Sequence, residues 1–405
     1  MRKLIGLLSL VCAFSCQEPL VDSLPRYMRE QGRHSQVVPG DTSARPVPGT
    51  DPSLPEYVPT VYATALHFRD SVNWRLDSLG AADVLFFKDG ELVQRVPVPS
   101  PPDPERHRIW HGQLWTDYTD GNETVLLCNG TERFRYQGEE QLRGFLIVDG
   151  DVHTLGQSPG NGGFSYRING KTVFSRDKGS VLGNPSSGAW EGGALYRDGE
   201  EIYYSCRIGR DYHVMQGGQT FRIIPAGSSD ALYDLRVRGG HLWRAEKHAG
   251  TLVLLCDDRV ASLSFSATDL LSCQLVPSGD QAVILGKGRM GGGWFSFWMA
   301  PFDTGIPITK GMGRSAQSEL CYRDPNIFFA DVNADGFLHQ LLLDGVDVGI
   351  PTNTFSCPLP LALYPAKGHY AAALTRNGEG PHLLLYDGKT VPLSFNGYFT
   401  SVIIE

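Results

Sequence analysis

The feature that most constrains this chain is a short hairpin pattern that recurs along most of its length. In each copy an apolar run leads into a turn with Asp or Gly and a second short run follows, as in residues 84–93 and 145–152. Asp-Gly, Asn-Gly and Gly-Gly turns accept the positive φ angles of two-residue hairpins. Apolar residues with helical spacing and without interrupting Gly or Pro are missing from residues 60–405, so the sequence predicts an all-β domain there.

The turn glycines give the pattern a period. Seven copies have their glycine at Gly90, Gly150, Gly199, Gly240, Gly305, Gly345 and Gly388. Two long gaps contain the stretches 97–104 and 286–293, which we interpret as insertions, and without them the period is about 40–50 residues, typical of one propeller blade. Second turns lie between these copies, at Asn129-Gly130, Asn169-Gly170, Gly217-Gly218, Asp257-Asp258 and Asn377-Gly378. Two hairpins per period is what a four-stranded blade requires.

This repeat resembles that of β-propellers as a class. It implies a single β-propeller of about seven four-stranded blades over residues 60–405, with six or eight blades also compatible and a pair of β-sandwiches as the structural alternative. A ring must close to protect its terminal strands. We expect residues 398–404 to pair with residues 61–66 and close it.

The first residues resemble the leader of a bacterial lipoprotein. Arg2 and Lys3 precede an apolar run at 4–14, too short for a transmembrane helix, and Ala13-Phe14-Ser15-Cys16 resembles the lipobox. The resemblance implies a signal peptide at 1–15 and lipidation of Cys16. The lipobox usually has Leu where Ala13 stands, and Ala13 with Ser15 also suits the ordinary signal peptidase, so a secreted soluble protein is the alternative. Gln17 implies the outer membrane, periplasmic or surface-facing.

Residues 16–59 are predicted to form a tether between the lipidated Cys16 and the domain. Eight prolines and few apolar residues leave too little surface to bury, so we expect a flexible stalk reaching roughly 35 Å. An arm packed on the domain is the alternative. Three Asp-Ser-aliphatic triplets, at 22–24, 70–72 and 77–79, resemble the O-glycosylation sequon of the Bacteroidota.

The net charge of the chain and the spacing of its acidic residues and cysteines narrow the range of possible partners and metal ions. The formal net charge is −8 and no long Lys/Arg run follows the leader, so we expect no nucleic-acid partner. Asp331, Asn333 and Asp335 precede a Gly, as in calcium loops, and resemble the loop of FG-GAP propeller repeats. His339 stands where that loop has an acid, so an ordinary hairpin turn is the alternative. No other cofactor is expected, and the cysteines lack the Cys-x-x-Cys spacing of zinc sites.

Aromatic residues provide a second candidate site. Trp110, His111, Trp115 and Tyr118 cluster near Asp117 and Asp120, and aromatic rings with carboxylates can bind or cleave sugars. The alternative is an ordinary strand whose aromatic side chains form the core. The remaining cysteines are expected to be mostly buried thiols, with at least one disulfide as the alternative.

These observations favour a binding protein over an enzyme. The sequence contains no Gly-x-Ser-x-Gly elbow, His-Glu-x-x-His motif or P-loop, and it assigns no catalytic residue. We therefore expect a membrane-tethered lipoprotein of the cell envelope whose propeller binds a protein or a glycan. A hydrolase or lyase acting on polysaccharide is the alternative.

Overall fold

The computed structural model describes residues 58–405 with several gaps. These gaps are 70–80, 100–106, 139, 183–193, 228, 230, 267–268, 291–292, 300–317, 324–325, 334, 336, 350–354, 357–360, 365–368 and 377–380. The leader, Cys16 and most of the tether therefore lie outside the described residues. The described part is built from strands, with one short 3-10 turn at Pro159–Asn161. No described helix has the length and apolarity needed to cross a membrane.

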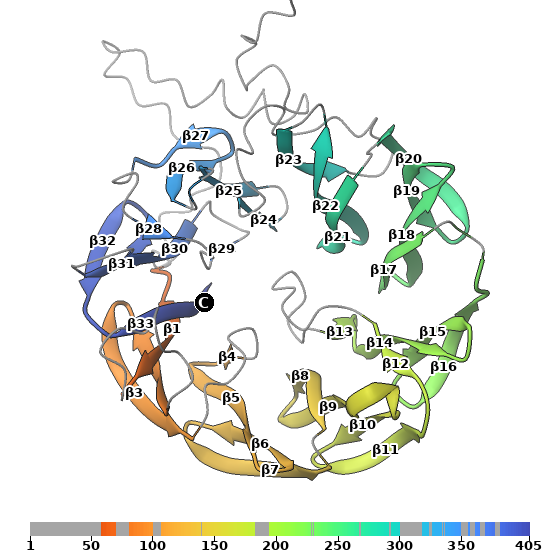
Figure 1. Cartoon of the computed structure of the whole chain (residues 1–405), viewed down its shortest axis with the longest axis horizontal. Helices are drawn as coiled ribbons and strands as arrows, with labels where there is room; N and C mark the ends of the chain where they lie inside the picture. Colours follow the sequence, from red (N-terminus) through yellow and green to blue (C-terminus); the bar gives the residue numbers. More distant parts are fainter. Residues whose placement is uncertain are drawn as a thin grey trace, which may run out of the picture.

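The strands form eight antiparallel sheets arranged around a ring, so the domain is an eight-bladed β-propeller (Figure 1). Blade 1 consists of β1 (Val61–Phe68), β2 (Ala82–Lys88), β3 (Glu91–Val98) and β33 (Gly397–Ile404). Blade 2 consists of β4 (Arg108–Trp110), β5 (Gln113–Asp120), β6 (Glu123–Cys128) and β7 (Thr131–Gln137). Blade 3 consists of β8 (Gln141–Val148), β9 (Asp151–Gln157), β10 (Phe164–Ile168) and β11 (Lys171–Arg176). Blade 4 consists of β12 (Ser180–Val181), β13 (Leu195–Asp198), β14 (Glu201–Ile208), β15 (Asp211–Gln216) and β16 (Gln219–Ile224).

The other four blades follow in chain order. Blade 5 consists of β17 (Ala231–Arg238), β18 (His241–His248), β19 (Thr251–Cys256) and β20 (Arg259–Ser266). In blade 6 the described strands are β21 (Asp269–Ser278), β22 (Gln281–Met290) and β23 (Gly293–Met299). Blade 7 consists of β24 (Glu319–Arg323), β25 (Asn326–Val332), β26 (Leu338–Leu343) and β27 (Val346–Asp347). Blade 8 consists of β28 (Phe355–Ser356), β29 (Leu361–Tyr364), β30 (His369–Arg376), β31 (His382–Tyr386) and β32 (Lys389–Leu393).

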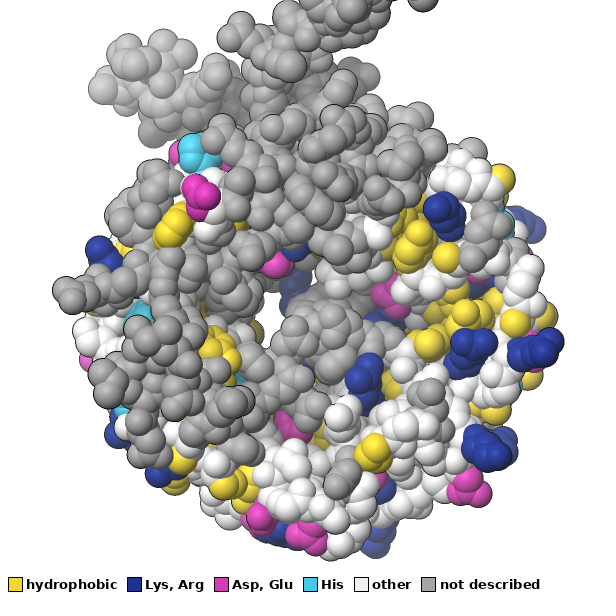
Figure 2. All heavy atoms as spheres, in the orientation of Figure 1, with side chains coloured by type: hydrophobic (Ala, Val, Ile, Leu, Met, Phe, Trp, Pro, Cys, Tyr) yellow, Lys and Arg dark blue, Asp and Glu magenta, His cyan; other side chains and the backbone are white. Residues whose placement is uncertain are grey.

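The two ends of the domain meet in blade 1. The last strand, β33, is the innermost strand of that blade and pairs antiparallel with β1, placing Val61 opposite Ile404 and Leu66 opposite Tyr398 (Figure 1). Thr60 and Glu405 extend the ladder, each donating its backbone N–H to the other's carbonyl at 2.8 and 2.9 Å. The predicted closing pair is thus confirmed. Seen down the ring axis, the molecule has an opening near its centre (Figure 2).

A shared turn fixes the outer part of most blades. The first residue of the turn between the third and fourth strands has a φ of 45–50° in six blades, where it is Asp89, Asn129, Asn169, Asp257, Asp344 or Asp387. Its side-chain oxygen accepts the backbone N–H of the first or second residue of the second strand, at 2.7–3.0 Å. Asp and Asn tolerate this left-handed conformation. One short side chain therefore fixes the second, third and fourth strands together.

The outermost strands carry a recurring irregularity. In five blades the pairing register shifts by one residue just after the turn between the third and fourth strands, leaving an extra residue at Val93, Arg133, Val173, Phe221 or Ala261. These positions are separated by 40, 40, 48 and 40 residues. A bulge twists an edge strand and so hinders pairing with another chain. It keeps the open perimeter of the ring from acting as a template for aggregation.

The blade count is eight, one more than the seven copies counted in the sequence. The counted glycines belong to two different hairpins: Gly150 joins the first and second strands of blade 3, whereas Gly90 joins the third and fourth strands of blade 1. The long gap between them holds all of blade 2, not merely an insertion. Gly305 lies outside the described residues.

The buried His107, which precedes β4, gives the fold a dependence on pH. Its side chain is 1% exposed, and neither ring nitrogen has a hydrogen-bond partner within the described part of the chain. Burial, with a smaller contribution from the charge of Arg108, lowers the pKa of His107 to about 3. Between that value and the unfolded pKa of about 6.5, the unfolded chain binds more protons, so stability falls as the pH falls.

We expect the free energy of unfolding to drop by about 2 kcal/mol between pH 7 and pH 5 because of this one group. Urea unfolding of the His107→Gln variant at both pH values should show a pH dependence smaller by that amount. Burial also lowers the pKa values of His67, His153 and His213, so some dependence remains in the variant. An unchanged pH dependence in His107→Gln would contradict this account.

Candidate functional site

One concavity among the described residues is a cleft between blades 4 and 5. Its volume is about 330 Å³, and it opens beside the outermost strand of blade 4, β16. Its lining comprises Arg222, Ile223, Ile224, Pro225, Leu242, Arg244, Glu246, His248, Leu255 and Asp258. Figure 2 shows several Lys and Arg side chains on the side of the ring where these blades lie. The cleft is therefore apolar on part of its wall and charged on the rest.

The charged wall comes from alternate residues of one strand. Arg244, Glu246 and His248 lie on β18, where successive side chains point to opposite faces, so all three share the face toward blade 4. Arg244 donates through Nη1 to Glu246 Oε1 at 2.8 Å, and His248 donates through Nε2 to Glu246 Oε2 at 2.7 Å. Both oxygens of Glu246, which is 1% exposed, are thus engaged.

Arg244 links this wall to the shared turn of blade 5. Its Nη2 donates to Oδ1 of Asp258, the second residue of that turn, at 2.5 Å. Its Nε is buried and finds no acceptor among the described residues. A buried donor without a partner costs about 1–3 kcal/mol, and more when it is charged. The fold bears this cost at Arg244, and the guanidinium that the cleft presents to a ligand is the exposed one of Arg222.

Arg222 brings a second positive charge to the cleft from the neighbouring blade. It lies on β16, is exposed, and contributes to the lowered pKa of Asp257 in blade 5. Burial raises the pKa of that carboxyl, and hydrogen bonds from His241 and the Leu242 N–H outweigh this effect. The two arginines face two carboxylates, those of Glu246 and Asp258. The arrangement can hold a polar ligand in a fixed orientation between the blades.

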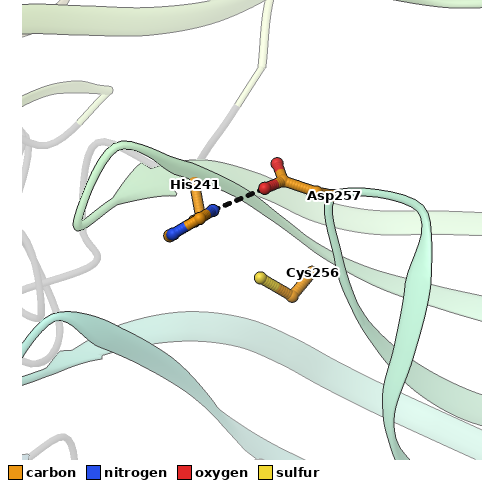
Figure 3. Close-up of side chains that lie close together, drawn as sticks. All are labelled: His241, Cys256 and Asp257. Carbon is orange, nitrogen blue, oxygen red and sulfur yellow. Dashed lines mark hydrogen bonds and ion pairs between the residues drawn. The ribbon is translucent and has the colours of Figure 1, made fainter.

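A second cluster lies at the same turn of blade 5. His241, Cys256 and Asp257 bring one ligand atom each to within 4.8 Å of one another. Figure 3 shows the three side chains converging at the end of the hairpin, with His241 Nδ1 at 2.5 Å from Asp257 Oδ2. His241 and Asp257 are exposed and Cys256 is half-buried. Three donor atoms of different kinds within one small volume form a candidate metal centre.

The predicted aromatic site lies in blade 2, and its members face different ways. Trp115 is buried in the cluster shared with blade 3, against which Trp110 also packs. Tyr118 instead packs against the cluster shared with blade 1. Trp110 and His111 contact each other edge to face, with ring centroids 4.5 Å apart, at the β4–β5 turn. Of the four residues, this pair is the best placed to meet a ligand.

The predicted calcium loop connects β25 and β26 in blade 7. Asp331 is buried at the end of β25 and Asp335 is exposed in the turn. The side-chain oxygen of Asn333 accepts the backbone N–H groups of Asp335 and Phe337, both at 3.0 Å. Asn333 therefore acts as a turn-forming residue here. Calcium binding at this loop stays a prediction.

Sequence reasoning missed both sites in blade 5. Asp257 and Asp258 were predicted only as a hairpin turn, and Cys256 as a buried thiol. The available signal was the alternation of Arg244, Glu246 and His248 in a strand expected to pack between blades. Cys128, Cys206, Cys256 and Cys273 are free thiols in the structure. Cys357 lies outside the described residues.

Comparison with known proteins supports the fold and identifies no function. No protein-family model and no curated protein matches the chain. The structure is similar to dihydro-heme d1 dehydrogenase NirN, with a TM-score of 0.52, 10% identity, and coverage of 84% of this chain and 74% of that one. It is also similar to AztD from Citrobacter koseri, with a TM-score of 0.49, 10% identity, and coverage of 86% and 98%. At 10% identity, the likeness to NirN shows a shared fold alone.

Proposed function

We propose that this protein is a lipid-anchored envelope protein whose propeller binds a protein or glycan partner. The observation that carries the proposal is the cleft between blades 4 and 5, which combines an apolar wall with a buried charged network on a rigid ring. Binding sites are commonly concave and mostly apolar, with a few well-placed polar groups. The exposed guanidinium of Arg222 at this cleft favours a ligand with oxygen acceptors, which peptides and sugars both have.

The membrane anchor is tested at Cys16. We expect the wild-type chain to fractionate with the outer membrane and the Cys16→Ala variant to appear in the soluble fraction, because the thiol that carries the acyl chains is gone. Cys12→Ala is the matched control, since Cys12 lies within the apolar leader, and it should stay in the membrane fraction. Membrane retention of Cys16→Ala would remove the anchor from the proposal.

The cleft is tested with exposed residues that the fold does not need. The full chain and its variants are used to capture partners from solubilised envelope, and captured proteins and glycans are identified separately. Arg222→Ala and Ile223→Ser, both on the exposed side of the cleft, should lose most of the captured partner. Val173→Ser is the matched control, because Val173 and Ile223 are each 50% exposed on an outermost strand. Equal capture by every variant would place binding elsewhere.

An enzyme acting on polysaccharide is the second candidate. The observation in its favour is the presence of two carboxylates, Glu246 and Asp258, with His248 in one cleft. Against it, both oxygens of Glu246 already accept hydrogen bonds. Release of new sugar ends from envelope polysaccharide by the wild type and not by Asp258→Asn would favour this function. Binding without turnover would favour the first.

A further inference from the structure

The His241, Cys256 and Asp257 cluster differs from what the blade architecture requires. The shared turn recurs in six blades, and in each the Asp or Asn accepts a backbone N–H from the second strand. The residue before that N–H is His241 in blade 5, and the residue before the turn is Cys256. Other blades hold the same backbone frame with other residues at these two positions, so each of them serves as an internal comparison.

Two other blades have some of the three residues, His, Cys and Asp, at the corresponding positions. Blade 8 has the same His–Asp pair, His369 Nδ1 and Asp387 Oδ2 at 2.8 Å, but Tyr386 stands in the place of the cysteine. Blade 2 has Cys128 before the turn, with Gln113 and Asn129 in the other two places. The shared turn thus forms in blade 8 without the Cys, and in blade 2 without the His and the Asp. Among the described blades, the conjunction of all three in blade 5 is not explained by folding.

We propose that His241, Cys256 and Asp257 form a binding site for a zinc-class divalent cation. Imidazole nitrogen, thiolate sulfur and carboxylate oxygen are the three donor types that Zn²⁺ takes from proteins. Bond lengths of about 2.0–2.3 Å place neighbouring ligand atoms of a tetrahedral site roughly 3.3–3.8 Å apart. To reach that range, the 2.5 Å between His241 Nδ1 and Asp257 Oδ2 must widen and the spread of up to 4.8 Å must narrow, and both changes need only rotations of side chains, two of which are exposed.

The backbone beside the cluster orients one of the three ligands. Oδ1 of Asp257 is held by the Leu242 N–H at 2.9 Å, which orients the carboxylate while Oδ2 faces His241. A hydrogen bond from the backbone to the carboxylate orients it as a metal ligand. Three protein ligands leave a fourth position open, and two of them are exposed to solvent. The site is therefore one from which a metal can exchange or to which a second molecule can add a ligand.

Binding must displace protons, so it depends on pH. The cation takes the thiolate, and the proton of the thiol goes to solvent. Affinity should therefore fall as the pH is lowered from about 8 to about 6.5.

The test uses the full chain titrated with Co²⁺ as a spectroscopic probe and with Zn²⁺ in competition. We expect one equivalent of Co²⁺ to bind with a thiolate-to-metal charge-transfer band that Zn²⁺ abolishes. Cys256→Ser should lose the band, and His241→Gln should weaken Zn²⁺ binding by at least about tenfold. His241→Cys keeps a metal ligand at that position and should restore binding.

Matched controls separate this site from the other cysteines and histidines. Cys128→Ser in blade 2 and His369→Gln in blade 8 occupy the same places in the blade and should leave the band and the affinity unchanged. Circular dichroism confirms that each variant is folded. Lack of a charge-transfer band in the wild type would overturn the proposal, as would a band that survives in Cys256→Ser. The capture experiment with Ile223→Ser changes neither these ligands nor a charge beside them, so the two proposals can fail independently.

Discussion

Replacing Phe399 by alanine should lower the free energy of unfolding by about 3–5 kcal/mol, the range for large core aromatics. Phe399 lies on the closing strand β33 and is 1% exposed. Its ring meets Phe87 and Phe395 edge to face, at centroid distances of 6.3 and 5.2 Å. Its backbone N–H donates to Thr375 Oγ1 in blade 8 at 3.1 Å. The substitution therefore leaves a cavity where blades 1 and 8 join.

The midpoint of urea unfolding measures the effect, and Phe221→Ala provides the control. Phe221 is 38% exposed on the outermost strand β16, so the same substitution should cost about 1 kcal/mol or less there. In a closed ring each blade is stabilised by its neighbours, so weakening the closure should also lower the cooperativity of unfolding. Equal effects of the two substitutions would mean that β33 does not close the ring.

Replacing Arg244 by methionine should lower the free energy of unfolding by a similar amount, about 3–5 kcal/mol. The side chain of Arg244 is 7% exposed and that of Glu246 is 1% exposed, so the pair is removed from water. Loss of the guanidinium leaves the Glu246 carboxylate buried with only His248 as a side-chain partner. Methionine keeps much of the volume, so the effect reports charge more than packing.

The double variant Arg244→Met/Glu246→Leu distinguishes this explanation from a loss of packing. Because a buried ion pair can be replaced by apolar residues at little net cost, the double variant should regain most of the stability lost in Arg244→Met. Arg135→Met is the control for an ion-pair network in contact with water. Arg135 meets Asp120, Glu123 and Glu132 there, and the substitution should change the free energy of unfolding little. A double variant less stable than Arg244→Met would refute the buried-pair account.

Much of the fold could be predicted because its turns need particular residues. Asp89-Gly90, Asn129-Gly130 and Asp387-Gly388 mark hairpins through their left-handed backbone, and each lies in the predicted position. The closing pair of terminal strands was also predicted and is confirmed. The count of seven missed blade 2 because its first hairpin turns at His111-Gly112, which has the required positive φ but is not an Asp-Gly, Asn-Gly or Gly-Gly pair.

The site could not be predicted in the same way, because it depends on contacts across blades. Arg222 and Arg244 belong to different sheets, and only the packing of blade 4 against blade 5 brings them into one cleft. The sequence also hides that Cys256 and His241, fifteen residues apart, meet at one end of a blade. The shared turn, whose Asp257 holds the start of the second strand, is what brings them together.

The most direct measurement of the closed ring is a disulfide cross-link between its two ends. Ala63 and Val402 face each other across the pairing of β1 and β33. They lie at a non-hydrogen-bonded position, where opposed Cα atoms are about 4.5 Å apart and within disulfide range. Mild oxidation of Ala63→Cys/Val402→Cys should give a peptide joining residues 63 and 402, while Ala63→Cys/Ser401→Cys, shifted by one residue, should not. Equal cross-linking of both pairs, or of neither, would contradict the ring.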